Sequence, residues 1–193
     1  METVQPEITR FHREYLWELS IPQTQLLALA DAVPGESYGW RPAQDARSLS
    51  EVLVHIAAGN FMLLYQAGVR TPEVIDVIGP VSGERIFRWV RIVRRNLELE
   101  RTVYQKSAVI DLLKRSFEAV VQSFTAASEE YLGAQMEFFG ENTTVRRLYL
   151  RILAHSHEHM GQAIAYTRSI GVRVPWPDPV KELERIVAGA GSR

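Results

Sequence analysis

The sequence contains no cysteine. This absence excludes disulfides, a thiolate nucleophile and cysteine-ligated metal sites, so any metal must be held by His, Asp or Glu. An excess of charge is also missing: the net charge is −1, which gives no reason to expect nucleic acid or an anionic membrane as a partner. No apolar run approaches the roughly 18 residues of a membrane span. The N-terminal residues lack the basic and apolar segments of a signal peptide, so we expect a cytoplasmic protein.

Strand patterns are missing as well, and helical spacing of apolar residues takes their place. A chain of 193 residues is most simply one domain. The spacing predicts an all-α protein, with a kink or a new helix start at Pro22. We expect an irregular stretch over 68–83 and a turn over 138–142. Four long helices are predicted at about 6–33, 48–64, 107–132 and 144–170, with shorter ones from about 84 and over 180–187.

Histidine is concentrated in one place, because three of the five histidines lie in the nine residues 154–162. On a strand, His155, His157 and His159 would share one face. On a helix, His155 and His159 lie one turn apart, whereas His157 points about 200° away. The cluster falls within the fourth helical segment. We therefore expect His155 and His159 to form a pair and His157 to face solvent or a neighbouring side chain.

Two imidazoles four residues apart can bind one divalent ion but leave its coordination incomplete. His55 is the best third candidate, because it lies in the apolar stripe of the second helix. The small residues 57–59 beside it allow another helix or a ligand to approach closely. Three histidines leave a coordination position open, as in catalytic rather than structural sites. The sequence thus predicts a metal site formed by His55, His155 and His159, although a hydrogen-bonded polar core without metal is the alternative.

Other polar residues have a structural and a functional interpretation. Gln162 and Tyr166 follow His155 on nearly the same helix face, so each could hold a ligand ring or a bound water. Glu51 lies one turn before His55 and could orient it, but it also completes a Ser48–Glu51 capping box. His12 stands alone in the first helix, where a surface or hydrogen-bonded residue is the commoner case. No residue is identified as a general base.

Three motifs resemble those of the DinB/YfiT-like family of metalloenzymes. They are Tyr-Gly-Trp-Arg-Pro at 38–42, Ser-Leu-Ser-Glu-Val-Leu-Val-His-Ile at 48–56, and His-Ser-His-Glu-His-Met-Gly-Gln at 155–162. The resemblance covers residues from about 5 to 177. Many members carry a further histidine just before the last ligand, where this chain has Glu158, so any role of that neighbour is in doubt here.

The resemblance implies a four-helix bundle with short extra helices, a divalent metal between helices and a homodimer. The family's metal-binding residues correspond to His55, His155 and His159, and Zn²⁺ or Ni²⁺ is the expected ion. We expect a bundle domain over 1–177, followed by a short C-terminal helix and a frayed tail over 178–193.

Two functions are consistent with these features. The first is an enzyme acting on a small molecule, either a metal-assisted hydrolase or a transferase that uses a low-molecular-weight thiol. Such a thiol would have to be a cosubstrate, since the chain has no cysteine. The second is a non-catalytic metal-binding or stress-response protein whose bundle serves dimerisation.

Overall fold

The computed structural model describes residues 8–79 and 84–190, and they are mostly helical. The long helices are α1 (Arg10–Ala32), α2 (Leu49–Gln66), α4 (Arg85–Thr102), α5 (Lys106–Thr125) and α7 (Val145–Ser169). The short elements are η1 (Gly35–Ser37), α3 (Pro72–Ile78), α6 (Glu129–Gly133), β1 (Gln135–Phe138), β2 (Glu141–Thr144) and α8 (Pro179–Ala190). No helix within the described ranges combines the length and apolar character needed to cross a membrane.

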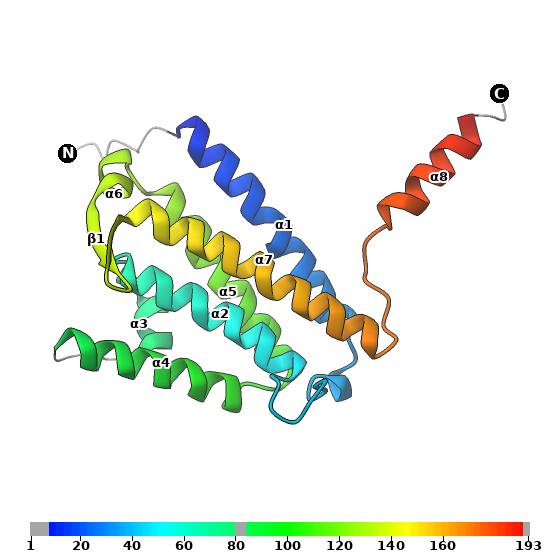
Figure 1. Ribbon diagram of the computed structural model, residues 1–193, viewed down its shortest axis with the longest axis horizontal. Coiled ribbons are helices and arrows are strands. Elements are labelled where there is room, and N and C mark those ends of the chain that lie inside the picture. The colour runs from blue at the N-terminus through cyan, green and yellow to red at the C-terminus, as the bar shows by residue number, and fades with distance from the viewer. Residues whose placement is uncertain (1–7, 80–83, 191–193) are drawn as a thin grey trace.

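Helices α1, α2, α5 and α7 form the predicted four-helix bundle, and α4 lies outside it against α2 (Figure 1). Helix α2 also packs on α5 and α7, while α1 packs on the same two partners. Enclosure of this kind requires a helix that is apolar all round. The sequence of α2 meets that need, because most of its residues are buried. The helix that carries His55 is therefore the most enclosed element of the fold.

Helix α2 begins where the sequence predicts. Ser48 accepts a hydrogen bond from the Glu51 backbone N–H, and the Ser48 N–H donates to the Glu51 carboxylate at 2.6 Å. This capping box occupies Glu51 and fixes the first turn of α2. The position of His55, one turn further on, is set by this start.

The third predicted helix is shorter than expected. Helix α5 ends at Thr125, and Ser128 caps the separate helix α6 by accepting from the Tyr131 N–H. Between them, the Ala127 carbonyl turns out of the helical path and accepts from His12 Nε2 at 2.9 Å. A long-range hydrogen bond thus ends the helix where the local apolar spacing would continue it.

A short hairpin also departs from the prediction of no strands. Strands β1 and β2 pair antiparallel, with Phe138 opposite Glu141. Four-residue strands are too short to show an alternating pattern. Phe139 and Gly140 form the connecting turn with φ angles of 51° and 83°. Such a conformation suits Asn-Gly, and it costs a side chain such as Phe roughly 1–2 kcal/mol.

Smaller differences concern helix ends and connections. Helix α1 continues through Pro22, so Pro22 does not start a new helix, and the alternative of a kink stays a prediction. Thr144 occupies the N-cap position of α7 without a side-chain capping hydrogen bond, and it also ends β2 opposite Gln135. The stretch expected to be irregular contains α3, which starts with Pro72 at its first turn. Helix α4, expected to be short, is as long as α2.

Some predictions lie outside the described residues: the start of the first helix, the turns around 80–83 and the last residues of the tail. The predicted C-terminal helix is present as α8, which stands apart from the bundle in Figure 1. Its apolar residues Val180, Leu183 and Val187 are exposed. The division at residue 177 stays a prediction.

Candidate metal centre

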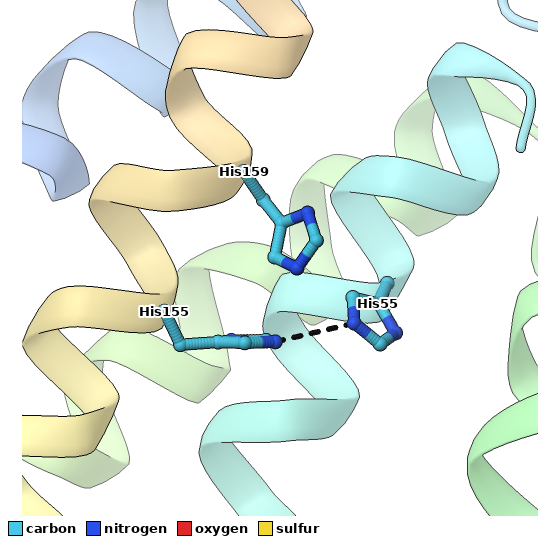
Figure 2. Close-up of side chains that lie close together, drawn as sticks. All are labelled: His55, His155 and His159. Carbon is cyan, nitrogen blue, oxygen red and sulfur yellow. Dashed lines mark hydrogen bonds between the residues drawn. The ribbon is translucent and has the colours of Figure 1, made fainter.

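Helices α2 and α7 lie side by side and bring the three predicted histidines together (Figure 2). His55 comes from the middle of α2, and His155 and His159 come from successive turns of α7. One ring nitrogen from each residue lies within 4.8 Å of the other two. This group is half-buried around a buried His155, so it lies at the edge of the core.

Two of the three rings are held through Nδ1. The Nδ1–H of His55 donates to the Glu100 carboxylate at 2.7 Å, because a carboxylate can only accept. Nδ1 of His159 lies 2.9 Å from Gln162 Oε1, and the Gln162 amide N–H donates to the Tyr166 hydroxyl at 2.9 Å. These bonds leave Nε2 of His55 and of His159 as the lone-pair nitrogen, which is the tautomer a metal ligand needs.

His155 is the most buried member of the group. Its Nε2 lies 3.2 Å from Nε2 of His55, and its Nδ1 is buried without a hydrogen-bond partner. Burial, together with the nearby His55 and His159, lowers the pKa of His155 to about 3. Burial also lowers the pKa of His159, although its hydrogen bond with Gln162 acts in the opposite direction. Both rings are therefore neutral, with a lone pair available, at neutral pH.

Close contact with α2 positions the His155 ring. A Cβ atom added to Gly59 would lie 2.6 Å from His155 Cε1 and 3.1 Å from Nδ1. Real Cβ atoms do not approach that closely, so only glycine permits this ring position. The small residues of α2 thus accommodate an imidazole from the neighbouring helix.

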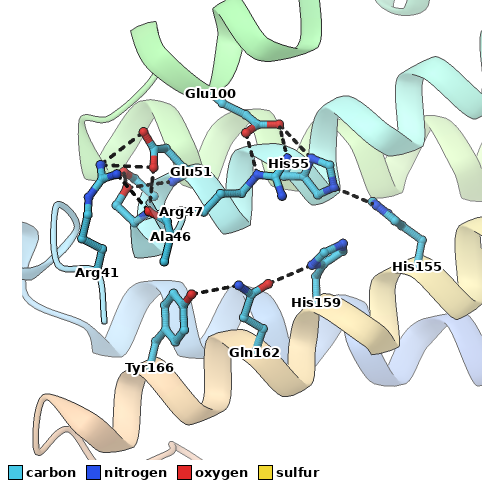
Figure 3. A network of polar contacts seen from close by, with 12 residues as sticks. Arg41, Ala46, Arg47, Glu51, His55, Glu100, His155, His159, Gln162 and Tyr166 are labelled. Atoms are coloured by element: carbon cyan, nitrogen blue, oxygen red, sulfur yellow. Dashed lines mark hydrogen bonds and ion pairs between the residues drawn. The ribbon is translucent and has the colours of Figure 1, made fainter. Parts of the chain in front are cut away.

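A buried carboxylate supports the group from outside the bundle. Glu100, in the last turns of α4, accepts from Arg47 Nε at 2.7 Å as well as from His55 (Figure 3). Burial alone would raise the pKa of Glu100, but the hydrogen bonds from His55 and Arg47 outweigh it and the pKa is lowered. Glu100 is therefore ionised and orients His55 as carboxylates orient histidine ligands in metalloenzymes.

The donor set fits a divalent ion. Two nitrogens at 2.0–2.1 Å from a tetrahedral ion lie roughly 3.3–3.4 Å apart. The 3.2 Å between Nε2 of His55 and Nε2 of His155 is close to that spacing. Among the described residues the group contains no fourth His, Asp or Glu. An ion held here would keep at least one position open.

A comparison with known protein families identifies the family of this chain. The model of the DinB superfamily matches residues 18–163. The chain belongs to the DinB superfamily. No curated protein matches it.

Two solved structures of DinB-like proteins share the fold. One, from Bacillus cereus ATCC 10987, is 17% identical and superposes with a TM-score of 0.65, covering 86% of this chain and 97% of the other. The second, YjoA from Bacillus subtilis, is also 17% identical, with a TM-score of 0.58 and coverage of 84% and 96%. At this identity the likeness concerns the DinB fold alone.

The structure also places the other polar residues that the sequence of this DinB-superfamily chain singles out. Gln162 and Tyr166 belong to the hydrogen-bond chain that holds His159. His157 faces α1, where its Nε2 lies 3.7 Å from the Glu18 carboxylate, so it stands apart from the group as predicted. The Glu51 carboxylate caps α2 and pairs with Arg41, so these two partners lie outside the histidine group. The carboxylate that orients His55 is Glu100.

Glu100 and Arg47 were absent from the predicted site, although the sequence carries a signal for the first. Glu100 follows Ile92 and Asn96 at intervals of four, and all three are buried. An acidic residue near a helix C-terminus is also unfavourable to the helix dipole, which suggests that another group stabilises it. Arg47 lies in the loop before α2, where no periodic pattern exists to place it.

A cavity of about 560 Å³ adjoins the centre on the side of the loop before α2. Glu100 and Gln162, which hold two of the three rings, line it together with Arg47, Arg101 and Leu97. Its volume suits a small molecule. The histidine group of this DinB-superfamily chain is thus next to a space that a substrate could enter.

Proposed function

We propose that the protein is a divalent-metal-dependent enzyme whose ion is held by His55, His155 and His159, with Zn²⁺ or Ni²⁺ as the metal. One observation carries this proposal: three imidazoles converge, and a carboxylate and an amide hold two of them through Nδ1. A metal held by three histidines supplies Lewis acidity and lowers the pKa of a water or thiol that reaches its open position.

The protein side chains have separate tasks in this proposal. Glu100 accepts from His55 Nδ1–H and so orients the ring with Nε2 toward the proposed ion, and Arg47 holds Glu100 in place. Gln162 does the same for His159, with Tyr166 fixing the orientation of the amide. The adjoining cavity would bind the substrate and exclude bulk water from it. We infer metal-assisted hydrolysis, or transfer to or from a low-molecular-weight thiol cosubstrate, as the reaction.

Metal analysis of untagged protein tests the site. We expect about one equivalent of Zn²⁺ or Ni²⁺ in the wild type, and its loss in His55→Ala and His159→Ala. His157→Ala is the matched control, since His157 lies on the same helix but faces α1. Absence of bound metal after reconstitution of correctly folded protein, or retention of metal in both site variants, would refute the proposed ligands.

Activity separates the enzyme from a non-catalytic metal-binding protein, the alternative function. The metal-loaded protein is assayed with ester and amide substrates and with thiol cosubstrates plus electrophiles. The cavity lined by Glu100 and Gln162, which hold two of the three histidines, favours turnover. Metal bound without any metal-dependent turnover across these classes would favour the alternative.

We also propose a homodimer, on the strength of the family resemblance. Sedimentation equilibrium across a range of protein concentrations tests it directly: the expected mass is twice the 22.0 kDa of the chain. A single 22.0 kDa species at all concentrations would exclude the dimer.

A further inference from the structure

A second cavity, also of about 560 Å³, lies between α2, α4 and the β1–β2 turn. It shares no lining residue with the cavity beside the histidines. Its walls include Tyr65 from the end of α2, Trp89 from α4, and Phe138 and Phe139 from the hairpin. Four aromatic side chains from three separate elements therefore surround one space, and the proposed metal chemistry uses none of them.

Phe139 is the most unusual of these residues. Its φ angle of 51° lies in the left-handed region, where Asn or Gly would be favoured in a two-residue turn. Its side chain is 73% exposed, so burial does not compensate for this conformation. The turn conformation disfavours phenylalanine, and the ring's aromatic partners are Phe138 and Trp89. A ligand that packs on the exposed part of the ring would add to these contacts.

Three of the rings contact one another at the cavity. Phe139 meets Trp89 edge to face, with ring centroids 5.2 Å apart and an interplanar angle of 84°. Phe138 also contacts Phe139, at a centroid distance of 4.4 Å. Aromatic pairs prefer offset or edge-to-face packing, so a flat ring can add to this group with little rearrangement.

Arg70 provides a fixed positive charge at the same cavity. Its guanidinium lies 3.7 Å from the centroid of the Tyr65 ring. Its Nη1 donates to the carbonyls of Tyr65, at 2.6 Å, and Val69, at 2.9 Å. These bonds use the donors of Nη1 and leave Nε and Nη2 directed elsewhere on a guanidinium that is already held. A pre-oriented arginine of this kind suits a planar anion such as a carboxylate.

We propose that this cavity binds a small aromatic acid. The flat apolar body would pack against Trp89, Phe138 and Phe139, and the carboxylate would accept from Arg70. The volume lies within the range of small-molecule sites, and the lining combines the aromatic rings with the polar side chains Gln66, Arg70, Arg88 and Glu137. The site is independent of the proposed metal centre.

Calorimetric titration with 2-naphthoate tests the proposal, with 2-naphthamide as the neutral analogue. We expect saturable 1:1 binding of the acid and at least tenfold weaker binding of the amide. Arg70→Gln should weaken binding of the acid at least tenfold. It should also remove most of the difference in affinity between the acid and the amide. Trp17→Gln should leave binding unchanged, because Trp17 is a comparably exposed aromatic residue on α1.

Phe139→Asn separates a ligand-binding role from a structural one. Asn-Gly suits the turn, so the melting temperature should rise or stay constant while naphthoate binding weakens at least tenfold. His159→Ala should bind naphthoate as the wild type does, which excludes capture of the carboxylate by a bound metal. The proposal is overturned if the wild type shows no saturable binding up to 10 mM, if Phe139→Asn binds normally, or if Trp17→Gln is equally impaired.

Discussion

His12 and His155 are both buried, but their surroundings differ. His12 uses both nitrogens: Nε2 donates to the Ala127 carbonyl at 2.9 Å, and Nδ1 lies 2.8 Å from the Thr9 hydroxyl. His155 has no partner for Nδ1, and its Nε2 meets only another histidine. Burial of a polar group without partners is unfavourable. The first histidine therefore stabilises the fold, whereas the second is retained at a cost that metal binding would explain.

The largest expected effect concerns His12. We expect His12→Ala to lower the free energy of unfolding by about 3 kcal/mol, since it leaves a cavity and an unsatisfied carbonyl. His155→Ala should lower the stability of the metal-free protein by only about 1 kcal/mol, because fewer hydrogen bonds are lost. Urea unfolding of both metal-free variants measures this difference. Equal losses would remove the distinction between the two residues.

Gly59→Ala should disturb His155 and leave the surroundings of His12 unchanged. The new Cβ would lie 2.6 Å from His155 Cε1, so the ring must move away from its present position. We expect metal affinity to fall about 30-fold, or about 2 kcal/mol. The thermal stability of the metal-free protein should change little, since the displaced atoms end a rotatable side chain. Competition with a chelator measures the affinity.

Gly161→Ala is the matched control for this substitution. Gly161 lies on α7 near the site, but a Cβ added there meets nothing within 4 Å. Metal affinity should equal that of the wild type, and the helix should gain roughly 0.5–1 kcal/mol from the better helix former. An equal loss of metal affinity in both variants would argue against a specific role for Gly59.

Glu100→Gln tests how much the charge of the carboxylate that holds His55 contributes to metal binding. The amide oxygen can still accept from Nδ1–H, but the charge-assisted hydrogen bond is lost. We expect metal affinity to fall about tenfold, at the lower end of the effect of such orienting groups. Glu98→Gln makes the same charge change at an exposed position of α4 and should have no effect on metal binding.

The pH dependence of the metal-free protein follows from the burial of His155. The pKa of His155 is about 3 in the folded state and about 6.5 in the unfolded chain. As pH falls below 6.5, the unfolded chain takes up this proton first, so stability declines until the pH approaches 3. The slope should be on the order of 1 kcal/mol per pH unit and should be smaller in His155→Gln, as urea unfolding at several pH values will show.

The sequence predicts the parts of this molecule that depend on local periodicity. Apolar spacing is sufficient for the four bundle helices and for the shared face of His155 and His159. The capping box at Ser48 fixes the start of α2. His55 could be selected as the third candidate metal ligand because it is the remaining histidine in an apolar stripe.

Contacts between distant residues explain what the sequence does not predict. The end of α5 depends on a bond from His12 to Ala127, more than a hundred residues away. The pairing of His55 with Glu100 depends on how α4 packs against α2, which no local pattern specifies. The β1–β2 hairpin was missed because its strands are only four residues long.

The position of α4 outside the bundle links the histidine group to local unfolding. Within residues 88–102 of α4, whose burial the structure describes, the buried side chains are Ile92, Asn96, Leu99 and Glu100. Segments of this kind open more readily than the core around them. Because Glu100 holds His55, any ion bound at the histidines also stabilises the docked state of α4. Hydrogen exchange should therefore slow along α4 when metal is added, although only its last turns contact the site.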